Sequence, residues 1–125
     1  MVAQAVHVLI VDDSPILREA LRGVLDAEGF LVSTAEHGRG ALEVLRAGPL
    51  PDVIVLDLMM PEMDGFAFRR AQLADPALAS IPVIIHSLTD AFEGCPVRLQ
   101  AAAYFEKPAD LSALVSEIRR LALRA

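Results

Sequence analysis

Residues 53–56 form an unbroken apolar run, and the next residue, Asp57, is a carboxylate. A continuous run that is rich in β-branched residues is typical of a strand buried on both faces of a parallel sheet. The following segment, residues 58–65, contains a proline and a glycine and therefore predicts a loop. Asp57 is thus expected at the carboxyl end of a buried strand, where open α/β sheets hold their ligand crevice.

The whole chain alternates apolar runs with stretches of helical periodicity. We expect strands over Val6–Val11, Phe30–Ala35, Val53–Asp57, Ile81–His86 and Ala103–Glu106. Helices are expected from Pro15 to about Glu28, over Gly38–Ala47, from Asp64 to Asp75, over Pro96–Ala102, and from Asp110 or Ser112 onward. This alternation predicts an α/β fold, a flavodoxin-like (βα)5 doubly wound five-stranded parallel sheet with the strand order 2-1-3-4-5. The second strand is more polar than the others and is expected at an edge.

Each predicted helix, apart from the short fourth one, has apolar residues that are expected to face the sheet. These are Ile16, Leu17, Ala20, Leu21, Val24 and Leu25 in the first helix, Ala41, Leu42 and Leu45 in the second, Phe66, Phe68 and Leu73 in the third, and Leu111, Leu114, Val115, Ile118 and Leu121 in the last. Ser14 is expected to cap the first helix and Asp64 the third, because such side chains accept hydrogen bonds from the free N–H groups of a first helical turn.

The composition is that of one globular domain. The 125 residues are 54% hydrophobic and 22% charged, which provides for a core and argues against disorder. We therefore expect a single domain over residues 1–125 with no output domain. A net charge of −6 without a basic stripe argues against direct nucleic-acid binding. The apolar start is too short for a membrane span, and the single cysteine, Cys95, fits a reducing compartment, so a cytoplasmic location is expected.

The predicted strand order brings three carboxylates to one crevice. Asp12 and Asp13 follow the first strand and Asp57 follows the third, and these two strands are neighbours in the sheet. Three carboxylates in one crevice repel one another unless a cation compensates them. Mg²⁺ is the natural candidate, because it takes one or two carboxylates, keeps several waters and leaves room for phosphate oxygens.

Two further polar residues fall at the ends of the last two strands. Lys107 is the only lysine among 11 basic residues, and its compact charge suits a phosphoryl oxygen. Ser87 lies 30 residues after Asp57, and its hydroxyl can donate a hydrogen bond to such an oxygen. Taken singly, Asp12-Asp13 can also be read as a solvated strand-end cap, Ser87 as a cap after a strand, and Lys107 as a chance occurrence in an arginine-rich composition.

Together these residues resemble the receiver domain of two-component response regulators, and the resemblance covers nearly the whole chain. The matching blocks are Val8–Ser14, Asp57–Gly65, Ile81–Ser87 and Tyr104–Pro108. The Asp57–Gly65 block is highly specific, and all four blocks occur in the order that the family shows.

The resemblance implies that Asp57 is the phosphoacceptor of a signalling switch. A histidine kinase, a phosphotransfer protein or a small acyl phosphate would supply the phosphoryl group, and an aspartyl phosphate would form. Asp13, Asp57 and the backbone carbonyl of Met59 would bind Mg²⁺ directly, and Asp12 would act through water. Lys107 would neutralise charge on the transferring group.

The resemblance also implies how the signal leaves the site. Ser87 would move toward the phosphoryl oxygens and Tyr104 would turn inward behind it, which alters the face formed by helix four, strand five and helix five. The expected partners are the kinase or phosphotransfer protein and a downstream effector or output domain, with no membrane. A phosphorylation-dependent dimer also fits this family. No enzymatic activity is expected beyond the protein's own phosphorylation and dephosphorylation.

Some positions depart from the family pattern. Leu88 stands where a small residue is usual, so its side chain is expected to crowd the phosphoryl site. The segment Asp90–Gln100 contains a glycine and a proline and is poor helix material, whereas the family has a full fourth helix there. Gln100-Ala101 takes the place of the usual Gly-Ala pair before the last strand.

The three histidines are not expected to be catalytic. His86 replaces an apolar residue of the family pattern, and we expect it to be packed, neutral and directed away from the face of Ser87. His7 and His37 are expected at the surface.

Three other classes of protein stay open on the sequence alone. A small Mg²⁺-dependent phosphohydrolase usually carries its nucleophile after strand one with a second aspartate two residues later, a spacing that Asp12-Asp13-Ser14 lacks. A flavin mononucleotide module needs a Ser/Thr/Gly-rich loop after strand one, and residues 13–17 contain no glycine. A degenerate receiver that binds partners without phosphorylation is disfavoured by the presence of all five site residues.

Overall fold

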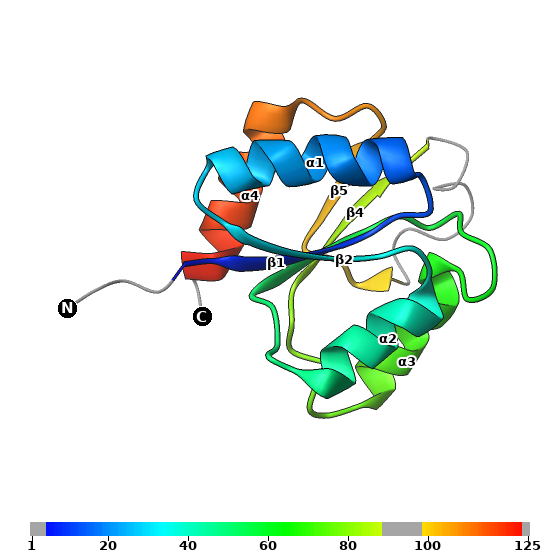
Figure 1. Ribbon diagram of the computed structural model, residues 1–125. Helices are drawn as coiled ribbons and strands as arrows, with labels where there is room; N and C mark the ends of the chain where they lie inside the picture. Colours follow the sequence, from blue (N-terminus) through cyan, green and yellow to red (C-terminus); the bar gives the residue numbers. More distant parts are fainter. Residues whose placement is uncertain (1–4, 89–98, 124–125) are drawn as a thin grey trace.

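The computed structural model describes residues 5–88 and 99–123, and these form a sheet with helices on both faces (Figure 1). The strands are β1 (His7–Val11), β2 (Leu31–Ala35), β3 (Val53–Leu56), β4 (Val83–Ser87) and β5 (Ala103–Glu106). The helices are α1 (Pro15–Ala27), α2 (Gly38–Ala47), α3 (Gly65–Ala74) and α4 (Leu111–Leu123). Within these described ranges, no helix has the length and apolar character needed to cross a membrane.

The strand order is β2-β1-β3-β4-β5, and every neighbouring pair is parallel, which confirms the predicted fold. The more polar strand β2 lies at one edge, as its sequence predicts, and β5 lies at the other. Val11 of β1 pairs with Leu56 of β3, so the two strands end side by side at the switch point of the sheet.

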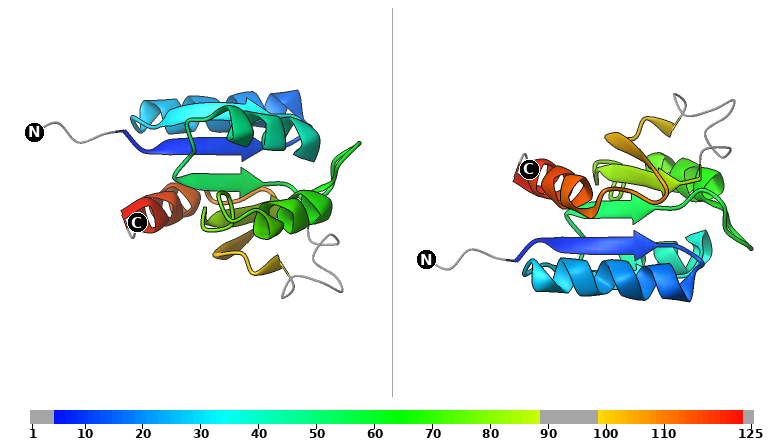
Figure 2. Two further views of the ribbon diagram at one scale, coloured as in Figure 1. Left: turned by 90° about the horizontal axis from the view of Figure 1, so that it is seen from below. Right: turned by 90° about the horizontal axis from the view of Figure 1, so that it is seen from above.

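Two hydrophobic cores fill the spaces between the sheet and its helices. Helices α1 and α4 cover one face, and α2 and α3 cover the other (Figures 1 and 2). Alternate residues of β1 face opposite sides, so that Val8 and Ile10 pack toward α1 and α4, whereas Leu9 and Val11 pack toward α2 and α3. Because both faces are covered, the central strands consist of continuous apolar runs.

The predicted helix caps are confirmed. Ser14 Oγ accepts a hydrogen bond from the Leu17 N–H at 3.2 Å, and Asp64 Oδ1 accepts one from the Ala67 N–H at 2.9 Å. At the start of α4 the capping residue is Asp110, whose Oδ1 accepts from the Ser112 N–H at 2.9 Å. These contacts fix the first turns of α1, α3 and α4 relative to the loops before them.

Several details of the predicted elements are wrong. Strand β4 begins at Val83 and includes Ser87, two residues later at its start and one at its end than expected. In α1, Ile16 is 84% exposed and Ala20 is also exposed, because both lie at least about 100° around the helix from the buried residues Leu21 and Leu25. The predicted helix over Pro96–Ala102 lies largely outside the described residues, and residues 99–102 contain no α-helical residue.

The buried face of α3 also differs from the prediction. Phe68 is buried as expected, but its fully buried neighbours are Arg69 and Gln72, whereas Phe66 and Leu73 are only partly buried. The physical reason is the helical period: residues at i, i+1 and i+4 share a face, and Phe66 is about half a turn away from Phe68. Polar residues therefore occupy core positions on this helix.

Candidate functional site

The carboxyl ends of β1, β3, β4 and β5 bring four predicted site residues together. Asp12 directly follows β1 and Asp57 directly follows β3, and the Asp57 N–H donates to the Val11 carbonyl at 2.9 Å. Ser87 ends β4 and Lys107 follows β5, and the Lys107 N–H donates to the Ser87 carbonyl at 2.8 Å. The backbone ladder of the parallel sheet therefore sets the relative positions of these side chains.

Three acidic residues lie close enough together to hold a metal ion. One carboxylate oxygen from each of Asp12, Asp13 and Asp57 lies within 4.8 Å of the others. Asp12 and Asp57 are buried, at 2% and 4% exposure, whereas Asp13 is exposed. The Ser14 N–H donates to Asp12 Oδ1 at 2.9 Å and holds that carboxylate in place. The cluster thus has two fixed oxygen donors and one that faces solvent.

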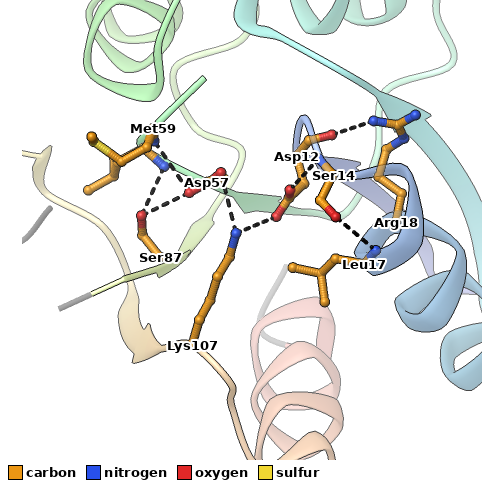
Figure 3. A network of polar contacts seen from close by, with 9 residues as sticks. Asp12, Ser14, Leu17, Arg18, Asp57, Met59, Ser87 and Lys107 are labelled. Carbon is orange, nitrogen blue, oxygen red and sulfur yellow. Dashed lines mark hydrogen bonds and ion pairs between the residues drawn. The ribbon is translucent and has the colours of Figure 1, made fainter. Parts of the chain in front are cut away.

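Lys107 bridges the two buried carboxylates (Figure 3). Its Nζ lies 2.8 Å from Asp12 Oδ2 and 3.3 Å from Asp57 Oδ2. Burial alone lowers the pKa of Lys107, but the hydrogen bonds and charges of Asp12 and Asp57 outweigh burial, and the net pKa lies above its ordinary value. The ammonium group therefore stays charged and partly neutralises the cluster.

The other oxygen of Asp57 is held by uncharged donors. Ser87 Oγ donates to Asp57 Oδ1 at 2.8 Å, and the Met59 N–H donates to the same atom at 3.3 Å. Ser87 Oγ in turn accepts from the Leu58 N–H at 3.4 Å. The Asp57 carboxylate is thus oriented by contacts to both of its oxygens, and the backbone of Met59 lies at the edge of the site.

Burial is the main influence on the acidity of Asp57. It raises the pKa of this carboxyl above its ordinary value, since the charged form loses water. The hydrogen bond from Ser87 lowers the pKa in part, the charge of Asp12 raises it, and the charge of Lys107 lowers it. Nearby cations therefore stabilise the ionised form of Asp57. A second cation, in addition to Lys107, would stabilise it further.

The loop between β3 and α3 packs directly against the site, and a glycine makes this possible. A Cβ atom at Gly65 would lie 2.4 Å from the Asp57 carbonyl oxygen and 2.7 Å from Leu58 Cα. Both contacts are far shorter than packed atoms allow, so only glycine fits here. Gly65, the last residue of the predicted motif, therefore allows the first turn of α3 to pack closely against the backbone of Asp57 and Leu58.

His37 has a structural role that the sequence reasoning missed. Its Nδ1 accepts a hydrogen bond from the Gly40 N–H at 3.0 Å, which caps α2, and its Nε2 lies 2.9 Å from Glu62 Oε2. His37 is only partly exposed and links α2 to the loop that follows Asp57. Histidine is an unusual capping residue, so capping preferences gave no signal for it.

Beside Lys107, an apolar cavity of about 330 Å³ opens between α1 and the segment that follows β5. His86 and Leu88 line it together with Leu17 of α1. His86 is 2% exposed, and burial lowers its pKa, which agrees with the predicted packed, neutral histidine. Leu88 is 55% exposed on this side of the site, and Tyr104 of β5 is 36% exposed.

A family model and several curated proteins match most of this chain, and they agree on one family. Residues 8–119 match the family described as Response regulator receiver domain. The response regulator MprA of Mycolicibacterium vanbaalenii is 36% identical over 121 residues, which cover 95% of this chain and 51% of MprA. The response regulator PleD of Caulobacter vibrioides is 39% identical over 120 residues, which cover 92% of this chain and 26% of PleD. The chain thus spans about half of MprA and about a quarter of PleD.

Solved structures show the same fold. The receiver domain of a signal transduction histidine kinase from Syntrophus aciditrophicus superposes with a TM-score of 0.86 at 33% identity, covering 97% of this chain and 92% of that one. The chemotaxis response regulator CheY4 of Vibrio cholerae has a TM-score of 0.83 at 28% identity, covering 94% of this chain and 99% of that one.

Proposed function

Because the chain belongs to the response regulator receiver domain family of two-component signalling, we propose that it is a phosphorylation-dependent switch whose phosphoacceptor is Asp57. The observation that carries this proposal is the environment of the Asp57 carboxylate. It is 4% exposed, lies at the end of the central strand β3, and has Ser87 Oγ at 2.8 Å and Lys107 Nζ at 3.3 Å.

In the proposed step, one carboxylate oxygen of Asp57 forms a bond to phosphorus while the bond between phosphorus and the donor breaks. The donor leaves with the electron pair of that bond. Lys107 lies where its charge can stabilise the negative charge that spreads over the phosphoryl oxygens. Ser87 loses a good acceptor once Asp57 carries the phosphoryl group, and its hydroxyl is then free to turn to a phosphoryl oxygen.

We also propose that Mg²⁺ binds at Asp13 and Asp57, with Asp12 acting through water and the Met59 carbonyl completing the protein's share. Three clustered carboxylates, of which Asp57 has a raised pKa, form an all-oxygen donor set that fits a hard divalent ion. Bound there, the ion would supply Lewis-acid stabilisation of phosphoryl charge. An open cavity of about 340 Å³ adjoins Asp13 and Met59 at the edge of this proposed site.

Mg²⁺ is expected to stabilise the folded protein at neutral pH. At free Mg²⁺ of 100 times the dissociation constant, the free energy of unfolding should rise by about 2.7 kcal/mol. The effect should fade as the pH falls through the raised pKa of Asp57, because protons then compete for the ligand oxygens. Thermal unfolding in MgCl₂ and in KCl of matched ionic strength measures this. An equal effect of KCl would contradict a specific site.

The surroundings of the site support a protein as phosphoryl donor. Leu88 is 55% exposed and Leu111 is 40% exposed, and both line the apolar cavity beside Lys107. Exposed apolar patches on a domain of this size are typical of protein contacts. We propose a sensor histidine kinase or a phosphotransfer protein as donor, and a downstream effector or an output domain as receiver of the signal, in the cytoplasm, with which the single cysteine agrees.

The test is phosphoryl uptake by the purified protein. Incubation with acetyl phosphate and Mg²⁺ should add one phosphoryl group, as seen by intact mass, and chelation of Mg²⁺ should prevent the gain. Absence of any gain, with a histidine kinase as donor as well, would overturn the proposed function. Steady turnover of a free phosphoester would instead indicate a phosphohydrolase.

A further inference from the structure

Helix α3 buries a polar pair, Arg69 and Gln72, where the fold offers core positions. Arg69 is 5% exposed and Gln72 is fully buried. Burial of a guanidinium group is unfavourable unless its N–H groups find acceptors. The hydrogen-bond acceptors of Arg69 and Gln72 therefore indicate the role of the pair.

Arg69 binds the chain just before β5. Its Nε donates to the Leu99 carbonyl at 2.8 Å, and its Nη2 donates to the Gln100 carbonyl at 2.9 Å. Its Nη1 donates to Gln72 Oε1 at 2.6 Å. Two adjacent carbonyl groups are thus held by one planar group, an arrangement that a lysine could not reproduce.

Gln72 completes the arrangement on the side of β4. Because Arg69 occupies the amide oxygen of Gln72, the amide nitrogen is left to donate, and it contacts the carbonyls of Leu78 and Ile81 at 3.0 Å each. The pair therefore ties α3 to the segments that lead into both β4 and β5. Within the described residues, Arg69 has carbonyl and amide oxygens as acceptors and no carboxylate among its contacts.

The segment that Arg69 holds is conformationally strained. Gln100 has φ = 53°, in the left-handed region that is unfavourable for residues with a Cβ atom. Such a conformation persists only where its surroundings over-determine it. The hydrogen bond from Arg69 to the Gln100 carbonyl supplies that constraint.

The held segment touches the candidate switch residue. The Ala101 N–H donates to the Tyr104 hydroxyl oxygen at 3.4 Å, and Tyr104 is 36% exposed. Burial lowers the pKa of Arg69, and the nearby Tyr104 counteracts this effect. The outward position of the Tyr104 ring is therefore linked to the backbone that Arg69 fixes.

We propose that Arg69 is a positioning residue of the switch, which holds residues 99–101 so that the Ala101 N–H retains Tyr104 in its outward position. The inference rests on the proposed phosphorylation switch and on the role of Tyr104 in it that the family resemblance implies. Loss of Arg69 frees the segment, so that Tyr104 turns inward without phosphorylation. For the loss of one ordinary hydrogen bond, the ratio of inward to outward Tyr104 should rise roughly fivefold.

The experiment uses the intrinsic fluorescence of Tyr104, because the chain has one tyrosine and no tryptophan. Acrylamide quenching is measured on the full chain without phosphoryl donor. Arg69→Leu should lower quenching below the value of unphosphorylated wild type, whereas Arg70→Leu, an exposed neighbour with the same change in charge, should leave it unchanged. Equal quenching in both variants, or a rise in Arg69→Leu, would overturn the proposal.

If Arg69→Leu does not fold, Arg69→Lys replaces it in the test. It keeps the charge but can hold only one of the two carbonyls, so quenching should again fall, and a wild-type value would overturn the proposal. A Gln100→Gly background removes the strain and should reduce the effect of Arg69→Leu; an undiminished effect would contradict action through Gln100. All comparisons are made without phosphorylation, so they stand or fall independently of phosphoryl uptake by Asp57.

Discussion

Asp57→Asn is expected to take up no phosphoryl group from acetyl phosphate or from a histidine kinase in the presence of Mg²⁺. The amide lacks the anionic oxygen that would attack phosphorus, and it also removes a carboxylate from the acidic cluster. Intact mass after incubation measures the loss. Asp26→Asn, at an exposed position of α1 far along the helix from the site, should take up one group like wild type. Phosphoryl gain by Asp57→Asn would move the phosphoacceptor to another residue.

The same variant is expected to be more stable than wild type at neutral pH without Mg²⁺. Since the pKa of Asp57 in the folded state lies above its ordinary value of 3.8, the folded protein binds more protons than the unfolded chain between these two values. Wild-type stability therefore falls as the pH rises through the folded pKa, and Asn escapes this loss. Thermal unfolding should show a difference on the order of 1 kcal/mol at neutral pH that vanishes below pH 3.8.

The placement of the site could be predicted from the sequence because it follows from topology. Apolar runs define the strands, and the alternation with helices defines a parallel sheet, so that Asp12, Asp57, Ser87 and Lys107 must share one edge. The register of β1 against β3 then brings the two buried carboxylates together. None of these steps requires knowledge of side-chain packing.

Contacts that depend on packing could not be predicted in the same way. Arg69 and Gln72 lie where the helical period places core residues, but polar residues carry no expectation of burial, and their acceptors at Leu99 and Gln100 are about 30 residues away. A signal was present, since Phe66, Phe68 and Leu73 do not form one stripe along a helix. The positive φ of Gln100 was likewise indicated only by the absence of the usual glycine.

Lys107→Ala is expected to separate phosphoryl uptake from the response of Tyr104. The variant leaves the buried carboxylates of Asp12 and Asp57 without their shared cation, so the pKa of Asp57 should rise further and stability should fall by roughly 3 kcal/mol without Mg²⁺. Mg²⁺ should restore most of this loss, because it brings positive charge to the same oxygens. Thermal unfolding with and without Mg²⁺ measures both effects. Arg46→Ala, which removes an exposed charge from α2, should show neither.

With Mg²⁺ present, Lys107→Ala should still gain a phosphoryl group, more slowly than wild type, but acrylamide quenching of Tyr104 should no longer change on phosphorylation. The reason is geometric. The Lys107 N–H donates to the Ser87 carbonyl, and Ser87 and Tyr104 belong to the neighbouring strands β4 and β5. A shift of the Lys107 side chain toward the phosphoryl group is therefore passed to these two strands. Lys107→Arg keeps the charge and should retain part of the response. A Lys107→Ala protein whose Tyr104 responds fully would assign the coupling to the Ser87 hydroxyl alone.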